Sequence, residues 1–277
     1  MSRVCRFAST RIRTWGMGLL SCALVAALTN ILVCGRLWAV YLPGGQPCQA
    51  VPTVFPGKTP DTRNVAEHVL RQTRRHGKLT IEVNLSYPSL GYAIIDDEIS
   101  RWTTSIFGVF EESLTNYPPD DEGDDASSEG QNYALQGTYT VSRPSDAAVS
   151  LTFELWTYTG GVHGNLDVIT LNYSLLTGQR LELVDLFEEL DEALSLMSKW
   201  SFQTLARRFA SAWSLQALKD GTAPDADNFA SLTLTPEGIT INFQPYQAAP
   251  WAAGAQTVEM PLEELAAAKP LTAVWGR

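Results

Sequence analysis

Alternating hydrophobic and polar residues predict most of the strands in this chain. Apolar side chains alternate with polar ones over residues 79–85, and this run ends at Tyr87-Pro88. The same alternation recurs at 133–141 and at 149–155, on either side of a turn at 143–146. This pair predicts an antiparallel hairpin with one buried face.

The second half of the chain repeats the pattern. An alternating strand at 169–175 is followed, much later, by strands at 232–234 and 239–243, which a Thr-Pro-Glu-Gly turn joins. A short strand at 257–260 and a capping helix at 262–268 complete the series. We therefore expect a second small sheet built from the later strands.

Two amphipathic helices separate these strands. Apolar residues recur at steps of three and four between 95 and 110, where Asp96 and Asp97 suit the N-terminal end of the helix dipole. A second helix is predicted to begin at Asp185, as its N-cap, and to present apolar residues between 190 and 209 to the core.

The order of elements predicts the fold class. Strand, helix and hairpin, followed by hairpin, helix and hairpin, indicate an α+β protein. We expect two small abutting halves, at residues 65–160 and 161–268, each an antiparallel sheet with a packed helix. Residues 42–64 are rich in proline and glycine and have no apolar period, which predicts a stalk.

The first 41 residues predict a membrane segment. Fourteen residues with four arginines and no acid precede residues 15–35, which carry no charged side chain and can cross a bilayer. We expect a single-pass anchor in the cytoplasmic membrane, with the N-terminus inside and the later residues extracytoplasmic, in the periplasm. The alternatives are export after cleavage near Leu37-Trp38-Ala39, and lipidation at Cys22.

Charge narrows the choice of partner. The chain has 20 Lys and Arg against 30 Asp and Glu, and residues 1–41 hold five of the basic residues and none of the acids. The rest of the chain therefore carries a net charge of −15. This charge argues against a nucleic-acid partner and favours a cationic one. The acidic run at 120–125 lacks the spacing of an EF-hand and predicts a solvated loop.

The stretch ELWTYTGGVHGN, at 154–165, is the first candidate site. His163 is a possible general base, with Asp167 the carboxylate that could orient it, which defines an enzyme hypothesis. The exported part holds only His68 and His76 besides His163, so no metal site is predicted. No cofactor and no catalytic residue are assigned.

The same stretch has a structural and a recognition interpretation. Its glycines permit positive φ or close approach of the backbone, with the imidazole bonded to a neighbouring strand. Trp156 and Tyr158 lie opposite the core positions Phe153 and Leu155 and can anchor a protein or glycan partner. The loop at 243–254 either packs over the sheet or adds to a binding surface. The candidate binding residues are Trp156, Tyr158, Gly160, Gly161, His163, Gly164, Tyr246 and Trp251.

Longer stretches carry a resemblance to known families. The sequences IEVNLSYPSL and YTVSRPSDAAVSLTFELWTYTGGVHG resemble the domain that precedes the catalytic part of PdaC-type peptidoglycan deacetylases. The sequences LNYSLLTGQRLELVDLF and LTLTPEGITINFQPYQAAPWAAG resemble the C-terminal domain of RsiV-type anti-sigma factors, which sense lysozyme. Together the two similarities span residues 78–267.

The resemblance implies a binding protein more than an enzyme. The chain lacks the metal-binding Asp and His-x-x-x-His motifs of the deacetylase domain, and offers only a short arginine-rich segment to a cytoplasmic sigma factor. What it implies is a non-enzymatic, membrane-anchored protein whose acidic ectodomain binds a lysozyme-like cell-wall hydrolase, as sensor or inhibitor. The alternatives are an envelope enzyme that uses His163, and a peptidoglycan-binding module.

Overall fold

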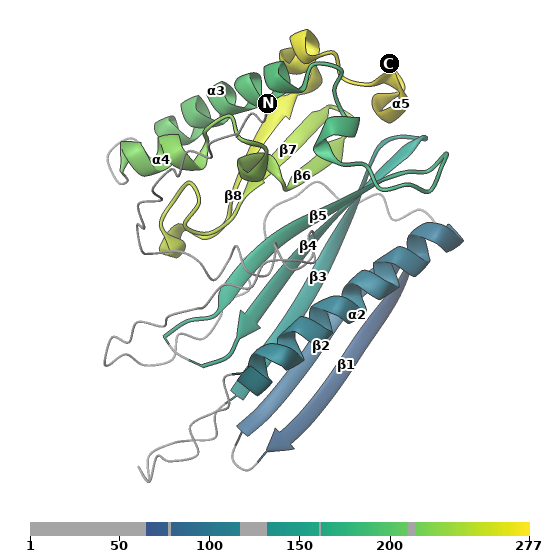
Figure 1. Ribbon diagram of the computed structural model, residues 1–277, viewed down its shortest axis with the longest axis vertical. Helices are drawn as coiled ribbons and strands as arrows, with labels where there is room; N and C mark the ends of the chain where they lie inside the picture. Colours follow the sequence, from purple (N-terminus) through teal and green to yellow (C-terminus); the bar gives the residue numbers. More distant parts are fainter. Residues whose placement is uncertain (1–64, 77–78, 117–131, 161, 210–213) are drawn as a thin grey trace, which may run out of the picture.

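The computed structural model describes residues 65–76, 79–116, 132–160, 162–209 and 214–277, which form two stacked β-sheets with helices on their outer faces (Figure 1). The first sheet has the strand order β1-β2-β3-β4-β5, and the second has the order β6-β7-β8. The α+β class and the division into two small halves, predicted from the sequence, are confirmed. The predicted stalk and membrane segment lie outside the described residues.

The first sheet is mixed rather than antiparallel. Its strands are β1 (Ala66–His76), β2 (Leu79–Ser89), β3 (Asn132–Ser145), β4 (Ala148–Tyr158) and β5 (Asn165–Ser174). All neighbours are antiparallel except β2 and β3, which run parallel from the pair Thr80–Asn132 to Leu85–Gly137. The prediction of purely antiparallel sheets was wrong here, because a helix between two strands returns the chain to the same end of the sheet.

Helix α2 (Ala93–Asn116) makes this crossover and covers one face of the first sheet. The carboxylate of Asp96 accepts hydrogen bonds from the backbone N–H groups of Leu90 and Gly91 and thus holds the entry to the helix. The apolar stripe of α2 packs on alternate residues of β2, β3 and β4, including Phe153 and Leu155. The face of β4 that carries Trp156 and Tyr158 therefore points away from α2.

The second sheet is antiparallel throughout. It consists of β6 (Leu232–Thr235), β7 (Gly238–Phe243) and β8 (Gln256–Pro261). The helices of this half are η1 (Leu183–Asp185), α3 (Leu190–Arg208), α4 (Leu215–Gly221), η2 (Ala226–Phe229), η3 (Trp251–Ala253), η4 (Leu262–Ala268) and α5 (Thr272–Trp275). Helix α3 and η4 share a core with the sheet.

The start of α3 differs from its prediction. Asp185 belongs to the short helix η1, where its carboxylate accepts a hydrogen bond from the backbone N–H of Glu182 at 2.9 Å. The long helix begins only at Leu190. Asp185 thus caps the turn before the helix, because its side chain is already engaged with Glu182.

The two sheets are joined through the face of the first sheet that α2 leaves open. Strand β6 lies against this face, and the hydroxyls of Thr152 and Thr233 are 2.6 Å apart across the junction. The predicted boundary at residue 160 falls between β4 and β5, which pair in one sheet. The change of sheet therefore comes after Ser174, because β5 completes the first sheet.

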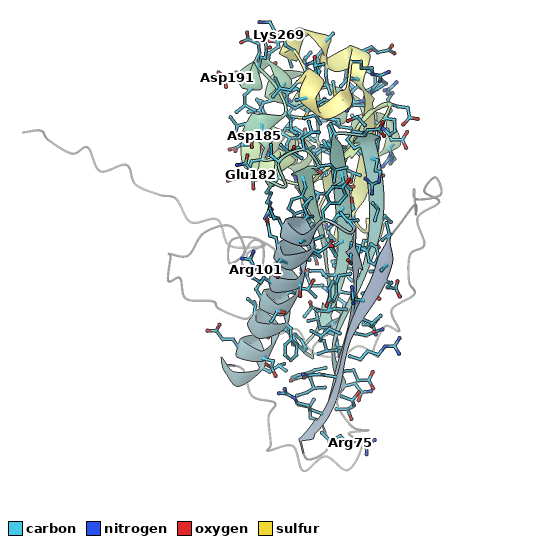
Figure 2. All side chains as sticks on the ribbon, turned by 90° about the vertical axis from the view of Figure 1, so that its right-hand side faces the viewer. Arg75, Arg101, Glu182, Asp185, Asp191 and Lys269 are labelled. Carbon is cyan, nitrogen blue, oxygen red and sulfur yellow. The ribbon has the colours of Figure 1, made fainter. Side chains whose placement is uncertain are left out.

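Charged side chains cover the outside of both halves (Figure 2). Asp191 and Lys269 lie at the end formed by α3 and η4, and Arg75 lies at the opposite end, near the tip of β1. Within the residues that the structure describes, no helix has the length and apolar character needed to cross a membrane.

Candidate functional site

The two candidate loops meet in the folded chain. The ring of His163, in the loop between β4 and β5, stacks on the indole of Trp251, the first residue of η3, with centroids 4.0 Å apart and planes 24° apart. One ring comes from the first half and the other from the second. We refer to Trp156, Tyr158, His163, Tyr246 and Trp251 as the aromatic junction.

Gln244 fixes the second loop to the first sheet. Its side-chain amide donates to the carbonyl of Val168 at 2.6 Å, and its Oε1 accepts from the backbone N–H of Val168 at 2.8 Å. This amide therefore makes both backbone hydrogen bonds that a neighbouring strand would make with β5 at this point. The loop after β7 can therefore move away from β5 only if both of these hydrogen bonds break.

Gln247 holds the far side of the same loop. Its side-chain amide donates to the carbonyls of Gly221 and Asn228, at 3.1 and 2.9 Å. Gly221 is required here, because a Cβ at this position would lie 1.8 Å from the carbonyl oxygen of Gln247. Two glutamines thus anchor the loop on opposite sides, which gives Trp251 a defined position before any partner arrives.

Gly164 positions Trp156. A Cβ on Gly164 would lie 2.4 Å from the indole carbon Cε2 of Trp156, so the indole rests directly on the glycine backbone. Gly160 has φ +90°, a conformation that favours glycine, and faces the ring of Tyr133. These two glycines have the close approach and the positive φ expected from the sequence. Gly161 lies outside the described residues.

Substitution of Gly164 by alanine is expected to displace the indole of Trp156. The added methyl group overlaps the ring, and relieving this overlap should lower the free energy of unfolding by about 1–3 kcal/mol. Urea denaturation followed by circular dichroism measures the change. The matched control is Gly108→Ala, on the exposed side of α2 with nothing within 4 Å of a new Cβ, which should stabilise the helix by about 1 kcal/mol. Equal effects at both positions would contradict the contact.

The remaining aromatic residues form a stacked pair and an exposed tip. The rings of Trp156 and Tyr158 are nearly parallel, at 14°, with centroids 5.9 Å apart, and both side chains are half-buried. Tyr246 is 54% exposed and has φ +70°. Val162, beside His163, is 55% exposed. The junction therefore combines fixed rings with freely accessible ones.

The structure separates His163 from its proposed carboxylate. Nδ1 of His163, as donor, lies 2.8 Å from the carbonyl oxygen of Gly164, and the side chain is exposed. Asp167 is 0% exposed, pairs in register with Leu155, and accepts a hydrogen bond from the amide of Asn165 at 2.9 Å. Among the described residues no carboxylate hydrogen-bonds to His163. The imidazole bonds within its own loop rather than to a neighbouring strand.

Two functional candidates were missed by sequence reasoning. Gln244 was not singled out, because a glutamine after a strand gives no sign of the backbone it will reach. Glu154 is half-buried on the same face of β4 as Trp156, and burial raises the pKa of its carboxyl group. The sequence did contain a sign of this, because Glu154 and Trp156 are two residues apart in a predicted strand and so share one face.

A hollow of 370 Å³ lies elsewhere in the molecule, between β1, β2 and α2. It is lined by Ile81, Val83, Phe107, Phe110 and Leu114, together with Gln72 and the ion pair of Arg74 and Glu111. None of the residues of the aromatic junction lines it. Within the described residues, no group of three or more His, Cys, Asp or Glu side chains is placed to hold a metal ion.

The fold and the junction define an α+β protein of two stacked sheets with an aromatic surface where two of their loops meet. Comparison with known proteins gives its relatives. Residues 184–263 match the model of DUF3298, a protein family of unknown function. The chain is also similar to the peptidoglycan-N-acetylmuramic acid deacetylase PdaC of Bacillus subtilis (strain 168), at 24% identity over 179 residues. This alignment covers 65% of the chain and 37% of PdaC.

Two crystal structures of DUF3298 family proteins share the fold. One, from Pseudomonas aeruginosa PAO1, has a TM-score of 0.56 at 13% identity and covers 76% of this chain and 96% of its own. The other, from Bacteroides fragilis NCTC 9343, has a TM-score of 0.52 at 17% identity and covers 76% and 95%. The resemblance to PdaC-type proteins is thus confirmed, and the resemblance to RsiV-type anti-sigma factors stays a prediction.

Proposed function

We propose that this chain is a non-enzymatic binding protein of the cell envelope, whose aromatic junction binds a cationic cell-wall hydrolase of the lysozyme type. The observation that carries the proposal is the stack of His163 on Trp251, which brings the two candidate loops into one surface. Binding of this kind would let the protein sense or inhibit the hydrolase.

The rigidity of the junction supports a role in binding. Gln244 and Gln247 hold one loop by hydrogen bonds to backbone groups, and Gly164 holds Trp156 in place. A surface that is ordered in advance loses little conformational entropy when a partner binds. Tryptophan and tyrosine side chains also supply large, flat contacts that are frequent among the residues that dominate binding energy.

Charge supports a cationic partner. Residues after position 41 carry a net charge of −15, which attracts a basic protein over a distance and speeds its association. The predicted membrane anchor would place this surface outside the cytoplasmic membrane, where cell-wall hydrolases act. The name of the relative PdaC connects that protein to peptidoglycan, which supports an envelope location for this chain as well.

The separation of His163 from Asp167 favours binding over hydrolysis. The enzyme hypothesis needs a carboxylate to orient His163, and among the described residues none hydrogen-bonds to it, since its Nδ1 donates to the carbonyl of Gly164 instead. We therefore do not assign the deacetylase activity of PdaC to this chain, which aligns with 37% of that protein.

Retention of the full chain, in mild detergent, on immobilised lysozyme tests the proposal. We expect binding that weakens as salt rises, because surface charges are screened over about 8–10 Å at physiological ionic strength. His163→Ala and Trp251→Ala should each weaken binding about tenfold or more. The control is Leu176→Ala, a residue 74% exposed in the turn after β5, which should leave binding unchanged. Absence of binding, or binding insensitive to salt, would contradict the proposal, and retention on purified peptidoglycan instead would favour the glycan-binding alternative.

A further inference from the structure

We propose that the aromatic junction receives a cationic side chain, a lysine or arginine of the bound partner, and that Glu154 is its counter-ion. This inference rests on the proposed function and adds to it the chemical group that the site recognises. It depends on where Glu154 lies, on what surrounds it, and on the absence of a counter-ion among the described residues.

Glu154 lies beside the stacked rings. It precedes Trp156 by two positions on β4, so both side chains project from the same face of the sheet, the one that α2 does not cover. The rings of Trp156 and Tyr158 continue this row toward the end of the strand. A carboxylate and two aromatic faces therefore line one strip of surface.

The strip is open on one side and closed on the other. In register with Glu154, Thr138 of β3 is exposed, whereas Val168 of β5 is buried. Gln136, opposite Trp156 on β3, is also exposed. A side chain from a partner thus has access across β3, while β5 and the loop held by Gln244 form a wall behind Glu154.

Glu154 has no partner within the described part of the chain. None of its neighbours in the sheet is charged: Thr138 and Val168 lie across from it, and Thr152 and Trp156 lie along β4. No hydrogen bond or ion pair to its carboxylate is found among the described residues, although the side chain is half-buried. A carboxylate partly removed from water without a partner lowers stability, and this partial burial is what raises the pKa of Glu154.

A cation from outside satisfies every feature of this arrangement. An ammonium or guanidinium group beside Glu154 would restore the interaction that the carboxylate lost with water. The exposed parts of the half-buried rings of Trp156 and Tyr158 would add cation–π attraction. Residues of binding sites often lower the stability of the free protein, because they are placed to interact with a ligand and not with the rest of the fold.

The test compares Glu154→Gln with Glu264→Gln in the full chain. Both substitutions remove one negative charge, and Glu264 is an exposed residue of η4. Two probes are used, lysozyme and an oligolysine peptide, with affinities measured by biolayer interferometry. We expect Glu154→Gln to weaken binding of both probes about tenfold or more, and Glu264→Gln to change it less than twofold.

The melting temperature of the same samples separates binding from folding. Glutamine has nearly the shape of glutamate and carries no charge, so Glu154→Gln should leave Tm unchanged or raise it. Equal effects of the two substitutions on the affinity for oligolysine would overturn the role of Glu154. If the wild-type chain does not bind lysozyme but does bind oligolysine, and Glu154→Gln weakens that binding, the proposed partner is overturned and the role of Glu154 stands.

Discussion

Trp275→Ala is expected to lower the free energy of unfolding by about 3–5 kcal/mol, the usual loss when a large buried ring is truncated. Trp275, in α5, is 4% exposed and packs against Phe187 with ring centroids 6.0 Å apart. Its indole N–H also donates to the carbonyl of Thr235 at 3.2 Å, at the turn between β6 and β7. The side chain of Trp275 thus packs in the core of the second half and also hydrogen-bonds to the turn between β6 and β7.

Urea denaturation measures this effect, and Trp275→Phe is the matched control. Phenylalanine keeps most of the apolar contact and loses the hydrogen bond, so it should cost about 1 kcal/mol for the bond, with a further loss for the smaller ring. If alanine costs no more than phenylalanine at this position, the ring is not part of the core as described.

Asn172→Ala is expected to lower the free energy of unfolding by about 2–4 kcal/mol, because it leaves buried polar groups of both sheets without partners. The amide of Asn172 donates to the carbonyl of Leu232 at 3.0 Å and accepts from the hydroxyl of Ser150 at 2.6 Å. That hydroxyl in turn accepts from the backbone N–H of Leu234 at 3.0 Å. Together with the Thr152–Thr233 pair, these side chains of β4 and β5 form polar contacts between the first sheet and β6.

A double-mutant cycle with Ser150→Ala tests whether the contact acts as a unit. Residues that share one hydrogen-bonded network should lose less together than the sum of their separate losses. The two substitutions, measured singly and combined by urea denaturation, should therefore be clearly non-additive. Strict additivity would mean that Ser150 and Asn172 stabilise the junction of the sheets independently.

The alternation of apolar residues predicted the strands of both cores from the sequence. It succeeded for β4 because one face of this strand meets α2 and the other does not, which places Phe153 and Trp156 on opposite sides. It failed for β1, whose residues are mostly exposed at the edge of the sheet, so no buried face imposes a pattern on them. The parallel pairing of β2 with β3 was also missed, because alternation does not record strand direction.

The sequence singled out the two loops of the candidate site but not the way in which they meet. Glycines and aromatic residues singled out two short segments, which the structure brings into contact. The stacking of His163 on Trp251 depends on how the second sheet lies on the first, and the polar residues Ser150 and Asn172 contribute to this arrangement. Such a contact between distant segments leaves no local pattern in the sequence, and neither do the backbone contacts of Gln244.

The parallel pairing of β2 with β3 also constrains how the chain is made. Strand β2 leaves the ribosome before α2 and β3, so one of its edges has no partner until the crossover helix has been synthesised and has folded back. A hairpin of two strands is only marginally stable in water. During this interval β1 covers the other edge of β2 and presents Arg71, Arg74 and Arg75 to the outside. Basic residues on an edge strand discourage pairing with other chains, so the arginines of β1 would protect the outer edge of this hairpin, while the other edge of β2 waits for β3.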